Sequence, residues 1–119
     1  MEEQITLGLT EKITVLGNNN QEEIVIARID TGATSSSIDL NLASKLQLGP
    51  ITKTKVVKSA SGIKKRPFIK VRIKLNEQII EEEFTLADRS HMTYPVLIGQ
   101  NILKMGNFLI DPKKEEGEK

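Results

Sequence analysis

The residues in this chain whose types and spacing could carry out chemistry are Asp30, Thr31 and Gly32. They follow the apolar run 24–29, and small polar residues come directly after them. Asp30 supplies a carboxyl group that can act as a general acid or base, and Thr31 supplies a hydroxyl that can hydrogen-bond across an interface. Gly32 permits a close backbone approach and a positive φ angle. The triplet therefore predicts a catalytic carboxylate on a tight turn after a buried strand, and the alternative is a turn Asp that bonds its own backbone.

Other short segments of the chain favour the catalytic interpretation when they are taken together. They are the apolar triplet and glycine at 96–99, the small polar segment 59–62 with Arg66, the run 86–95 and the run 108–112. Over residues 22 to 112 this pattern resembles the retropepsin-like aspartic proteases. Within them it resembles the small bacterial and archaeal proteins labelled ATP-dependent zinc proteases, some of which are encoded beside an ATP-grasp ligase that adds glutamate to a ribosomal protein.

The resemblance implies an all-β fold, a closed retropepsin-like barrel with one or two short helices and one lobe per chain. Such a fold needs two lobes to build one site, so a homodimer with Asp30 from each subunit is expected. Two carboxylates within hydrogen-bond distance repel each other and hold one shared proton. One then acts as the base toward a water molecule and the other as the acid toward the scissile amide.

The resemblance also implies which residues bind substrate. Arg66 and Arg89 match the characteristic basic residues of the family, and a fixed Arg suits the carboxylates of an oligoglutamate tail by bidentate hydrogen bonding. Arg28 lies two positions before Asp30 and shares its side of the strand if the alternation holds; the alternative is an exposed Arg paired with a nearby Glu. The remaining expected substrate-binding residues are Ala33 and the segment where a retropepsin carries its flap, Ser59, Ala60, Ser61 and Gly62.

Several neighbouring residues bear on cofactors and on the rigidity of the site. Asp88 either orients Arg89 or forms an ordinary loop pair with it. His91 is the only His and there is no Cys, so no zinc site and no other cofactor is predicted. No Gly-rich phosphate loop is present, so any use of ATP would come from a partner. Gln100 departs from the resemblance, because retropepsins commonly carry at this position an Arg that braces the active-site turn.

Charge is distributed unevenly along the chain. The formal net charge is +1, yet ten Lys and Arg residues and no acidic residue lie between Leu40 and Asn76. Such a block can attract an anionic partner. The rival function is therefore a non-catalytic, dimeric retropepsin-like module that binds an acidic protein or nucleic acid through residues 53–74. Nucleic acid is the weaker candidate, because the chain has three Phe, one Tyr and no Trp for base stacking.

Hydrophobic periodicity predicts a chain made almost entirely of strands. Alternation at 68–75 and the turn pair Asn76-Glu77 predict a hairpin that sets Arg72 opposite Glu81 and Lys70 opposite Glu83. The other expected elements are strands at 5–9, 13–16, 22–29, 37–38, 96–98 and 108–110, a helix at 40–46 capped by Asp39, and a helix at 100–104.

Length and composition set the remaining expectations. The 119 residues predict one domain at 1–112, followed by a charged, disordered tail at 113–119. The absence of Cys fits a reducing compartment. There is no apolar stretch near the roughly 18 residues of a membrane helix, and the N-terminus is acidic and polar, so we expect a cytoplasmic protein without a membrane partner.

Overall fold

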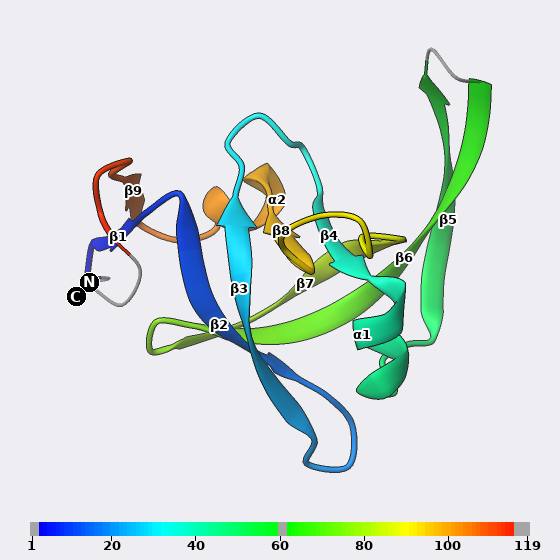
Figure 1. The fold of residues 1–119 in the computed structure, drawn as a ribbon, viewed down its shortest axis with the longest axis horizontal. Helices are drawn as coiled ribbons and strands as arrows, with labels where there is room; N and C mark the ends of the chain where they lie inside the picture. Colours follow the sequence, from blue (N-terminus) through cyan, green and yellow to red (C-terminus); the bar gives the residue numbers. More distant parts are fainter. Residues whose placement is uncertain (1–2, 60–61, 116–119) are drawn as a thin grey trace.

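The computed structural model describes residues 3–59 and 62–115, which form strands joined by short connections and two short helices (Figure 1). The strands are β1 (Ile5–Leu7), β2 (Thr10–Leu16), β3 (Glu22–Ile29), β4 (Ser36–Asp39), β5 (Ile51–Ser59), β6 (Gly62–Leu75), β7 (Gln78–Ala87), β8 (Val96–Ile98) and β9 (Phe108–Ile110). The helices are α1 (Leu40–Lys45) and α2 (Gln100–Leu103). The predicted all-β class with short helices is confirmed.

Six of the strands close into a barrel. The sheet order is β2-β3-β8-β4-β7-β6, and an additional pairing of β2 with β6 joins its two ends. Closure removes the open sheet edges that would otherwise be free to pair with other chains. Of the seven strands in this sheet, β5 alone lies outside the ring, where it pairs with β6 in the described part of the chain.

Alternating side chains of the barrel strands fill its interior. On β6 every second residue from Ile69 to Leu75 is buried, while Lys70, Arg72 and Lys74 point outward. The largest fully buried side chains are Leu7, Ile13, Val15, Ile38, Ile69, Val71, Ile73, Leu75, Phe84, Val96, Ile98 and Ile102. Buried side chains of β8 and β4 belong to this core, so the strands beside residues 30–35 are fixed by it.

Strand β8 fixes the position of the predicted catalytic turn. It lies between β3, with which it runs parallel, and β4, with which it runs antiparallel. Residues 30–35, called here the Asp30 turn, leave β3 and return into β4 beside the end of β8. The amide of Asp30 donates to the carbonyl of Ile98 at 2.9 Å, so the turn is tied to β8 at its first residue.

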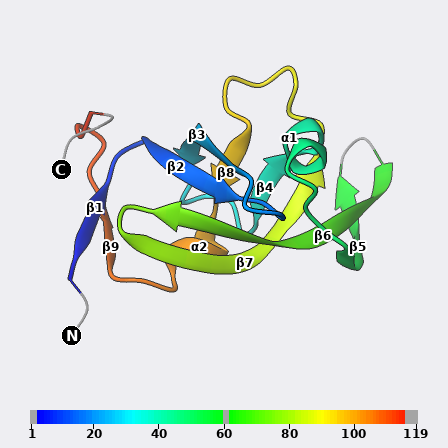
Figure 2. The same cartoon turned by 90° about the horizontal axis from the view of Figure 1, so that it is seen from below.

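The hairpins have the pairing that the sequence predicts. Arg72 lies opposite Glu81 and Lys70 opposite Glu83 on β6 and β7, and Asn76 adopts the positive φ of a tight hairpin turn. The predicted Asp39 cap is also confirmed, because its carboxylate accepts the amide of Asn41. Strands β5 and β6 together form a long hairpin that projects from the barrel (Figures 1 and 2).

The two ends of the chain meet on one side of the barrel. Strand β1 pairs in parallel with β9, and Ile5 lies opposite Phe108. Just beyond β9, the Lys114 ammonium binds the Glu11 carboxylate at 2.9 Å and the Thr6 carbonyl at 2.8 Å. The charged tail predicted from residue 113 thus includes a Lys that packs against the barrel, while residues 116–119 lie outside the described part.

Among residues 3–59 and 62–115, no helix has the length and the apolar character needed to cross a membrane.

Candidate active site

The Asp30 turn presents a carboxylate that its own backbone orients. The Gly32 amide donates to Asp30 Oδ1 at 2.9 Å, and the Ala33 amide donates to the Asp30 carbonyl at 3.3 Å. Asp30 is half-buried, whereas Thr31 and Gly32 are exposed. This geometry agrees both with a turn Asp that bonds its own backbone and with a catalytic Asp. The Gly32 amide occupies Oδ1, and Oδ2 accepts no hydrogen bond from a described residue.

The first residue of α2, Gln100, forms two hydrogen bonds with this turn. The Gln100 amide donates to the Ala33 carbonyl at 2.8 Å, and the Gln100 side-chain amide donates to the Thr31 carbonyl at 2.7 Å. A Cβ atom at Gly99 would lie 2.4 Å from the Ser35 carbonyl oxygen. Glycine is thus required at position 99, where the chain leaves β8 in contact with the turn. Gln100 holds the turn by hydrogen bonds alone, because its side chain carries no charge.

Glycine has a different role at the turn than the sequence indicates. Among the described glycines, positive φ angles occur at Gly49 and Gly62 and not at Gly32. A Cβ at Gly32 would meet only Asp30 Oδ1, at 3.4 Å. Gly32 therefore does not use the positive φ that glycine permits: the turn closes through the Asp30 side chain, and the close backbone approach occurs at Gly99.

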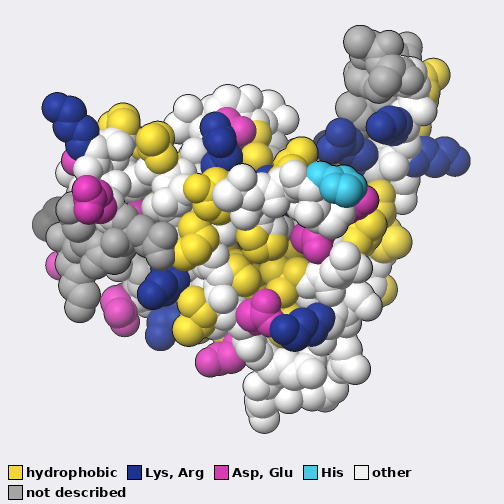
Figure 3. All heavy atoms as spheres, viewed as in Figure 1, with side chains coloured by type: hydrophobic (Ala, Val, Ile, Leu, Met, Phe, Trp, Pro, Cys, Tyr) yellow, Lys and Arg dark blue, Asp and Glu magenta, His cyan; other side chains and the backbone are white. Residues whose placement is uncertain are grey.

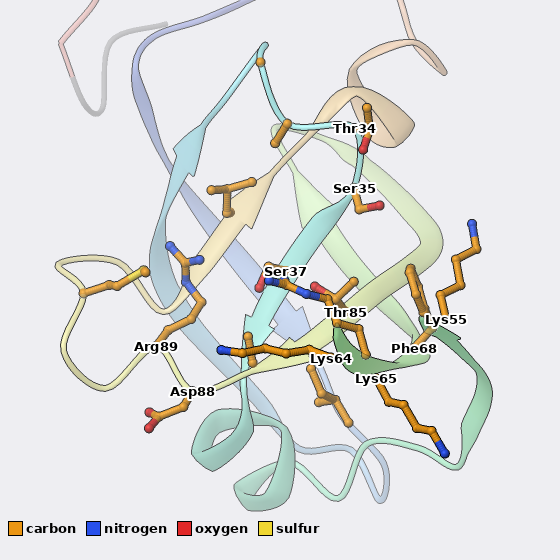
Figure 4. A pocket seen from close by; sticks show the side chains of 17 residues that line it. Thr34, Ser35, Ser37, Lys55, Lys64, Lys65, Phe68, Thr85, Asp88 and Arg89 are labelled. Atoms are coloured by element: carbon orange, nitrogen blue, oxygen red, sulfur yellow. The ribbon is translucent and has the colours of Figure 1, made fainter. Parts of the chain in front are cut away.

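A hollow of about 930 Å³ begins at Gly32 and Ala33 and extends under the β5–β6 hairpin. Its other walls include Phe68 and the loop after β7 (Figure 4). The polar and basic side chains that line it are Thr34, Ser35, Ser37, Lys55, Lys64, Lys65, Arg66, Thr85, Asp88 and Arg89. Three of the predicted substrate-binding residues line this larger hollow together, although they lie far apart in the sequence: Ala33, Arg66 and Arg89.

Arg89 is the buried cation of the site, with 8% of its surface exposed. Its backbone amide donates to Asp39 Oδ1 at 2.8 Å, and its Nε donates to the Tyr94 carbonyl at 2.9 Å. Burial lowers the pKa of Arg89; the Asp39 charge opposes this effect and the Arg28 charge adds to it. Because no terminal guanidinium nitrogen has a hydrogen-bond partner among the described residues, this end of Arg89 is available to a ligand.

Asp88 does not orient Arg89. Its carboxylate accepts the Ser90 hydroxyl at 2.6 Å and the Ser90 amide at 3.0 Å, and these bonds lower its pKa. In Figure 4 the Asp88 side chain points away from Arg89. Of the two roles that the sequence leaves open for Asp88, the structure favours an ordinary loop residue.

Arg28 lies on the rim of a second, smaller hollow of about 420 Å³. Arg28 is exposed and faces this hollow together with Arg89, His91 and Tyr94, and it lies opposite Leu97 of β8. No Glu or Asp contributes to the described wall of this hollow. No described Glu pairs with Arg28, which was the alternative that the sequence left open, and Arg28 instead adds positive charge beside Arg89.

The basic block divides into a neutralised half and a free half. Lys53 pairs with Glu83 at 2.9 Å, and this bond is the main cause that lowers the Glu83 pKa. Farther along the hairpin, Lys55 lies directly opposite Arg66. Basic side chains gather over the hairpin in Figure 3. Among the residues described, Lys55, Lys64, Lys65 and Arg66 have no acidic partner, so like charges face each other across two strands.

Reversing the charge of Arg66 should therefore stabilise the hairpin. We expect Arg66→Glu to raise the free energy of unfolding by about 0.5 kcal/mol, because a carboxylate would then lie opposite Lys55. Urea denaturation at fixed protein concentration measures this change. The mirror-image control is Lys70→Glu, which places a carboxylate opposite Glu83 and should lower stability by a similar amount. A loss of stability in Arg66→Glu would contradict the assigned register.

The expected flap segment is described only in part. Strands β5 and β6 end and begin at Ser59 and Gly62, which lie opposite each other, and Gly62 has a φ of 121°. Ala60 and Ser61 lie outside the described residues, as does the Ser59 side chain. Their predicted contact with substrate stays a prediction.

Comparison with protein families identifies the chain. A model of the RimB-like family, described as retropepsin-like aspartic endopeptidase RimB, matches residues 42–119, about two-thirds of the chain. The chain belongs to the RimB-like family. The matched region of this RimB-like protein includes Arg66, Arg89 and the Gly99 brace, and it begins after the Asp30 turn. A search of curated protein sequences gave no match.

Solved structures share the fold of this RimB-like protein. The protein Lpg0085 of Legionella pneumophila, whose function is unknown, is 25% identical with a TM-score of 0.66, and the match covers 95% of this chain and 97% of that one. Simian foamy virus protease is 15% identical, with a TM-score of 0.59 and coverage of 78% and 89%. EIAV protease, solved with the inhibitor HBY-793, is 21% identical, with a TM-score of 0.57 and coverage of 78% and 84%. The two viral enzymes confirm the retropepsin-like fold.

Sequence reasoning missed three contributors to the site of this RimB-like protein. Asp39 was predicted only as a helix cap, yet it also holds the Arg89 backbone from 50 residues away. From the sequence, Gln100 departs from the resemblance and can still form a hydrogen bond without a charge, but its partners are not predicted; the structure shows two bonds to the turn. Lys64 was counted in the basic block without a role, and Figure 4 shows it extending across the larger hollow. In described residues no three His, Cys, Asp or Glu side chains come together as metal ligands would.

Proposed function

We propose that this protein is an aspartic endopeptidase or amide hydrolase that works as a homodimer, with Asp30 of each subunit as the catalytic pair. The observation that carries the proposal is the Asp30 carboxylate, which the Gly32 amide holds at 2.9 Å. Gly32 and Ala33 line the larger hollow, and Asp30 directly precedes them in the turn. Membership of a family of retropepsin-like aspartic endopeptidases supports the same chemistry. Thr31 and Gly32 belong to the same catalytic turn.

A dimer is proposed because the Asp30 turn of one chain carries a single carboxyl group. The aspartic-protease mechanism uses two carboxyl groups that share one proton, and Asp30 is the sole acidic residue of its turn. The Leu9 carbonyl accepts the amide of Ile29, next to Asp30, and the Leu9 side chain is 55% exposed. Met105 and Leu109 are also about half exposed. These apolar side chains suit burial against a second copy.

The two carboxyl groups would divide the reaction between them. The ionised Asp30 takes a proton from water while the hydroxide attacks the carbonyl carbon, and the protonated Asp30 gives its proton to the carbonyl oxygen. The Asp30 that took the proton from water then gives it to the amide nitrogen, while the other Asp30 takes a proton back from a hydroxyl of the tetrahedral intermediate. The C–N bond breaks, and the new carboxyl group retains the oxygen from water. The pair returns to its single shared proton.

The proposed substrate is an acidic peptide or protein segment, such as a glutamate-rich or glutamate-tailed chain, in the cytoplasm. Arg89 and Arg66 reach the larger hollow together with Lys64 and Lys65, and Arg28 reaches the smaller hollow. A buried, fixed guanidinium binds carboxylate in a bidentate manner with little loss of side-chain entropy. Ala33 and the flap residues 59–62 would contact the peptide backbone.

Matched peptides test the substrate. We expect a glutamate-rich peptide to be cut with kcat/KM at least about tenfold above that of the same peptide with glutamine, because charge-assisted hydrogen bonds are the stronger ones. Raising the salt from about 0.05 to about 0.5 M should remove the part of this difference that comes from the exposed Lys64, Lys65 and Arg66, since exposed charges are screened more than buried ones. The glutamine peptide is the control for general salt effects. Equal rates for the two peptides at low salt would contradict electrostatic recognition.

The unpaired cations on the hairpin favour one other candidate function, a non-catalytic module that binds an acidic protein. In that case an acidic peptide binds but is not cut, and Asp30→Asn leaves binding unchanged. A nucleic acid would instead show a steep loss of affinity with salt and competition by duplex or single strands.

A further inference from the structure

We propose that Gln100 is a positioning residue that holds the Asp30 carboxylate through the peptide group between Thr31 and Gly32. This inference rests on the proposed role of Asp30. Retropepsins commonly carry an Arg at this position, whereas here a neutral glutamine bonds the backbone of the turn.

Two hydrogen bonds share this one peptide group. Gln100 Nε2 donates to the Thr31 carbonyl oxygen at 2.7 Å, and the Gly32 amide donates to Asp30 Oδ1 at 2.9 Å. The Thr31 carbonyl and the Gly32 amide belong to the same planar unit and point in opposite directions. The Gln100 side chain therefore fixes the direction of the N–H that orients the catalytic carboxylate.

The bonds also strengthen one another. A carbonyl that accepts a hydrogen bond polarises its peptide group, so the N–H at the other end becomes a better donor. The Gly32 amide then binds the Asp30 carboxylate more firmly than an unsupported turn amide would. Thr31, Gly32 and Gln100 are all near the surface, and no other described side chain bonds to the Thr31 carbonyl.

The backbone of Gln100 makes the side-chain contact possible. Its amide donates to the Ala33 carbonyl at 2.8 Å, so Gln100 grips the turn on both sides of Gly32. The Gly99 amide in turn donates to Ser36 Oγ, and that hydroxyl donates to Asn101 Oδ1. The start of α2 is thus fixed to β4 independently of the Gln100 side chain, which can be changed without releasing the helix.

Gln100→Met tests the proposal because it keeps the length of the side chain and removes its donor. We expect kcat for peptide cleavage to fall by roughly ten- to hundredfold, the effect of a misplaced catalytic group, with KM within about twofold. The midpoint of thermal unfolding should fall by no more than about 5 °C, since one exposed hydrogen bond is lost. Gln100→Lys restores a donor and should recover most of kcat.

The Gly32 amide gives a second measurement that does not depend on activity. In nitrogen-15 labelled protein, its proton resonance should move upfield in Gln100→Met and return toward the wild-type position in Gln100→Lys. The matched control is Gln21→Met, the same change in the exposed turn at the other end of β3, which should alter neither kcat nor the Gly32 resonance.

The outcomes separate this proposal from the proposed function. An unchanged Gly32 resonance in Gln100→Met overturns the positioning role, even if kcat falls. A shifted resonance with kcat equal to that of Gln21→Met also overturns it. If wild-type protein cuts no peptide at all, the endopeptidase proposal fails, whereas the Gly32 resonance still reports whether Gln100 orients the Asp30 carboxylate.

Discussion

Replacing Asp30 with asparagine should lower kcat/KM for peptide cleavage by about 10⁴-fold while the protein stays folded. Asparagine has the same shape, and its side-chain oxygen can still accept the Gly32 amide, so the turn keeps its geometry. It cannot take a proton from water or pass one to the leaving amine. Mass-spectrometric analysis of an acidic peptide panel, from acidic to neutral pH, measures the loss.

The matched control is Asp111→Asn. Asp111 accepts the amide of Lys113, two residues on, just as Asp30 accepts that of Gly32. It lies after β9, however, and the residues that follow it line neither hollow, whereas Gly32 and Ala33 line the larger one. We expect full activity from this variant. Residual cleavage by Asp30→Asn above a hundredth of the wild-type rate would contradict the role of Asp30.

Mixtures of wild-type and Asp30→Asn protein test whether two chains share one site. After subunits exchange at equal amounts, a shared site leaves about one quarter of the wild-type activity, whereas a site within one chain leaves about one half. Size-exclusion chromatography with light scattering confirms that both proteins are dimers before mixing. A linear dependence on the wild-type fraction would contradict the proposed Asp30 pair.

Gly99→Ala should be among the most destabilising single substitutions in the chain. The new Cβ would lie 2.4 Å from the Ser35 carbonyl oxygen and 2.9 Å from that of Ala33. Both atoms are backbone, so the Asp30 turn or β8 must move. We expect the free energy of unfolding to fall by about 3 kcal/mol, which corresponds to roughly 10 °C in the unfolding midpoint.

Gly32→Ala is the control for Gly99→Ala, because it adds the same methyl group within the Asp30 turn that Gly99 contacts. That methyl group would meet only Asp30 Oδ1 at 3.4 Å, an ordinary contact, so the unfolding midpoint should change by less than about 3 °C. Thermal unfolding at equal protein concentration compares the variants. Equal effects of the two substitutions would contradict the close approach at Gly99.

Local sequence patterns predict the elements around the site well. Strands β3 and β8 are apolar runs bounded by turn residues, and both have the predicted bounds. The period-two pattern and the Asn76 turn predict the β6–β7 register, since a two-residue turn leaves one way to pair the arms. The resemblance adds the closed barrel, which no local pattern contains.

Contacts between distant residues could not be predicted in the same way. The sequence places Asp88 beside Arg89, whereas folding brings Asp39 to the Arg89 backbone and turns Asp88 toward Ser90. The choice depends on the parallel pairing of β4 with β7, which sets Asp39 opposite Ala87. The grip of Gln100 on Thr31 likewise depends on β8 lying between β3 and β4. Such pairings follow from how all strands pack at once, not from spacing along the chain.

The parallel pairing of β1 with β9 also has a consequence for biosynthesis. As the chain emerges from the ribosome, β1 is made first, yet Ile5 finds its partner Phe108 only after 103 further residues. Loop closure over such a distance is slow compared with local pairing, so this contact forms late in folding. A nascent chain therefore lacks this small sheet until β9 has left the ribosome, and until then β1 stays without the strand that covers its edge.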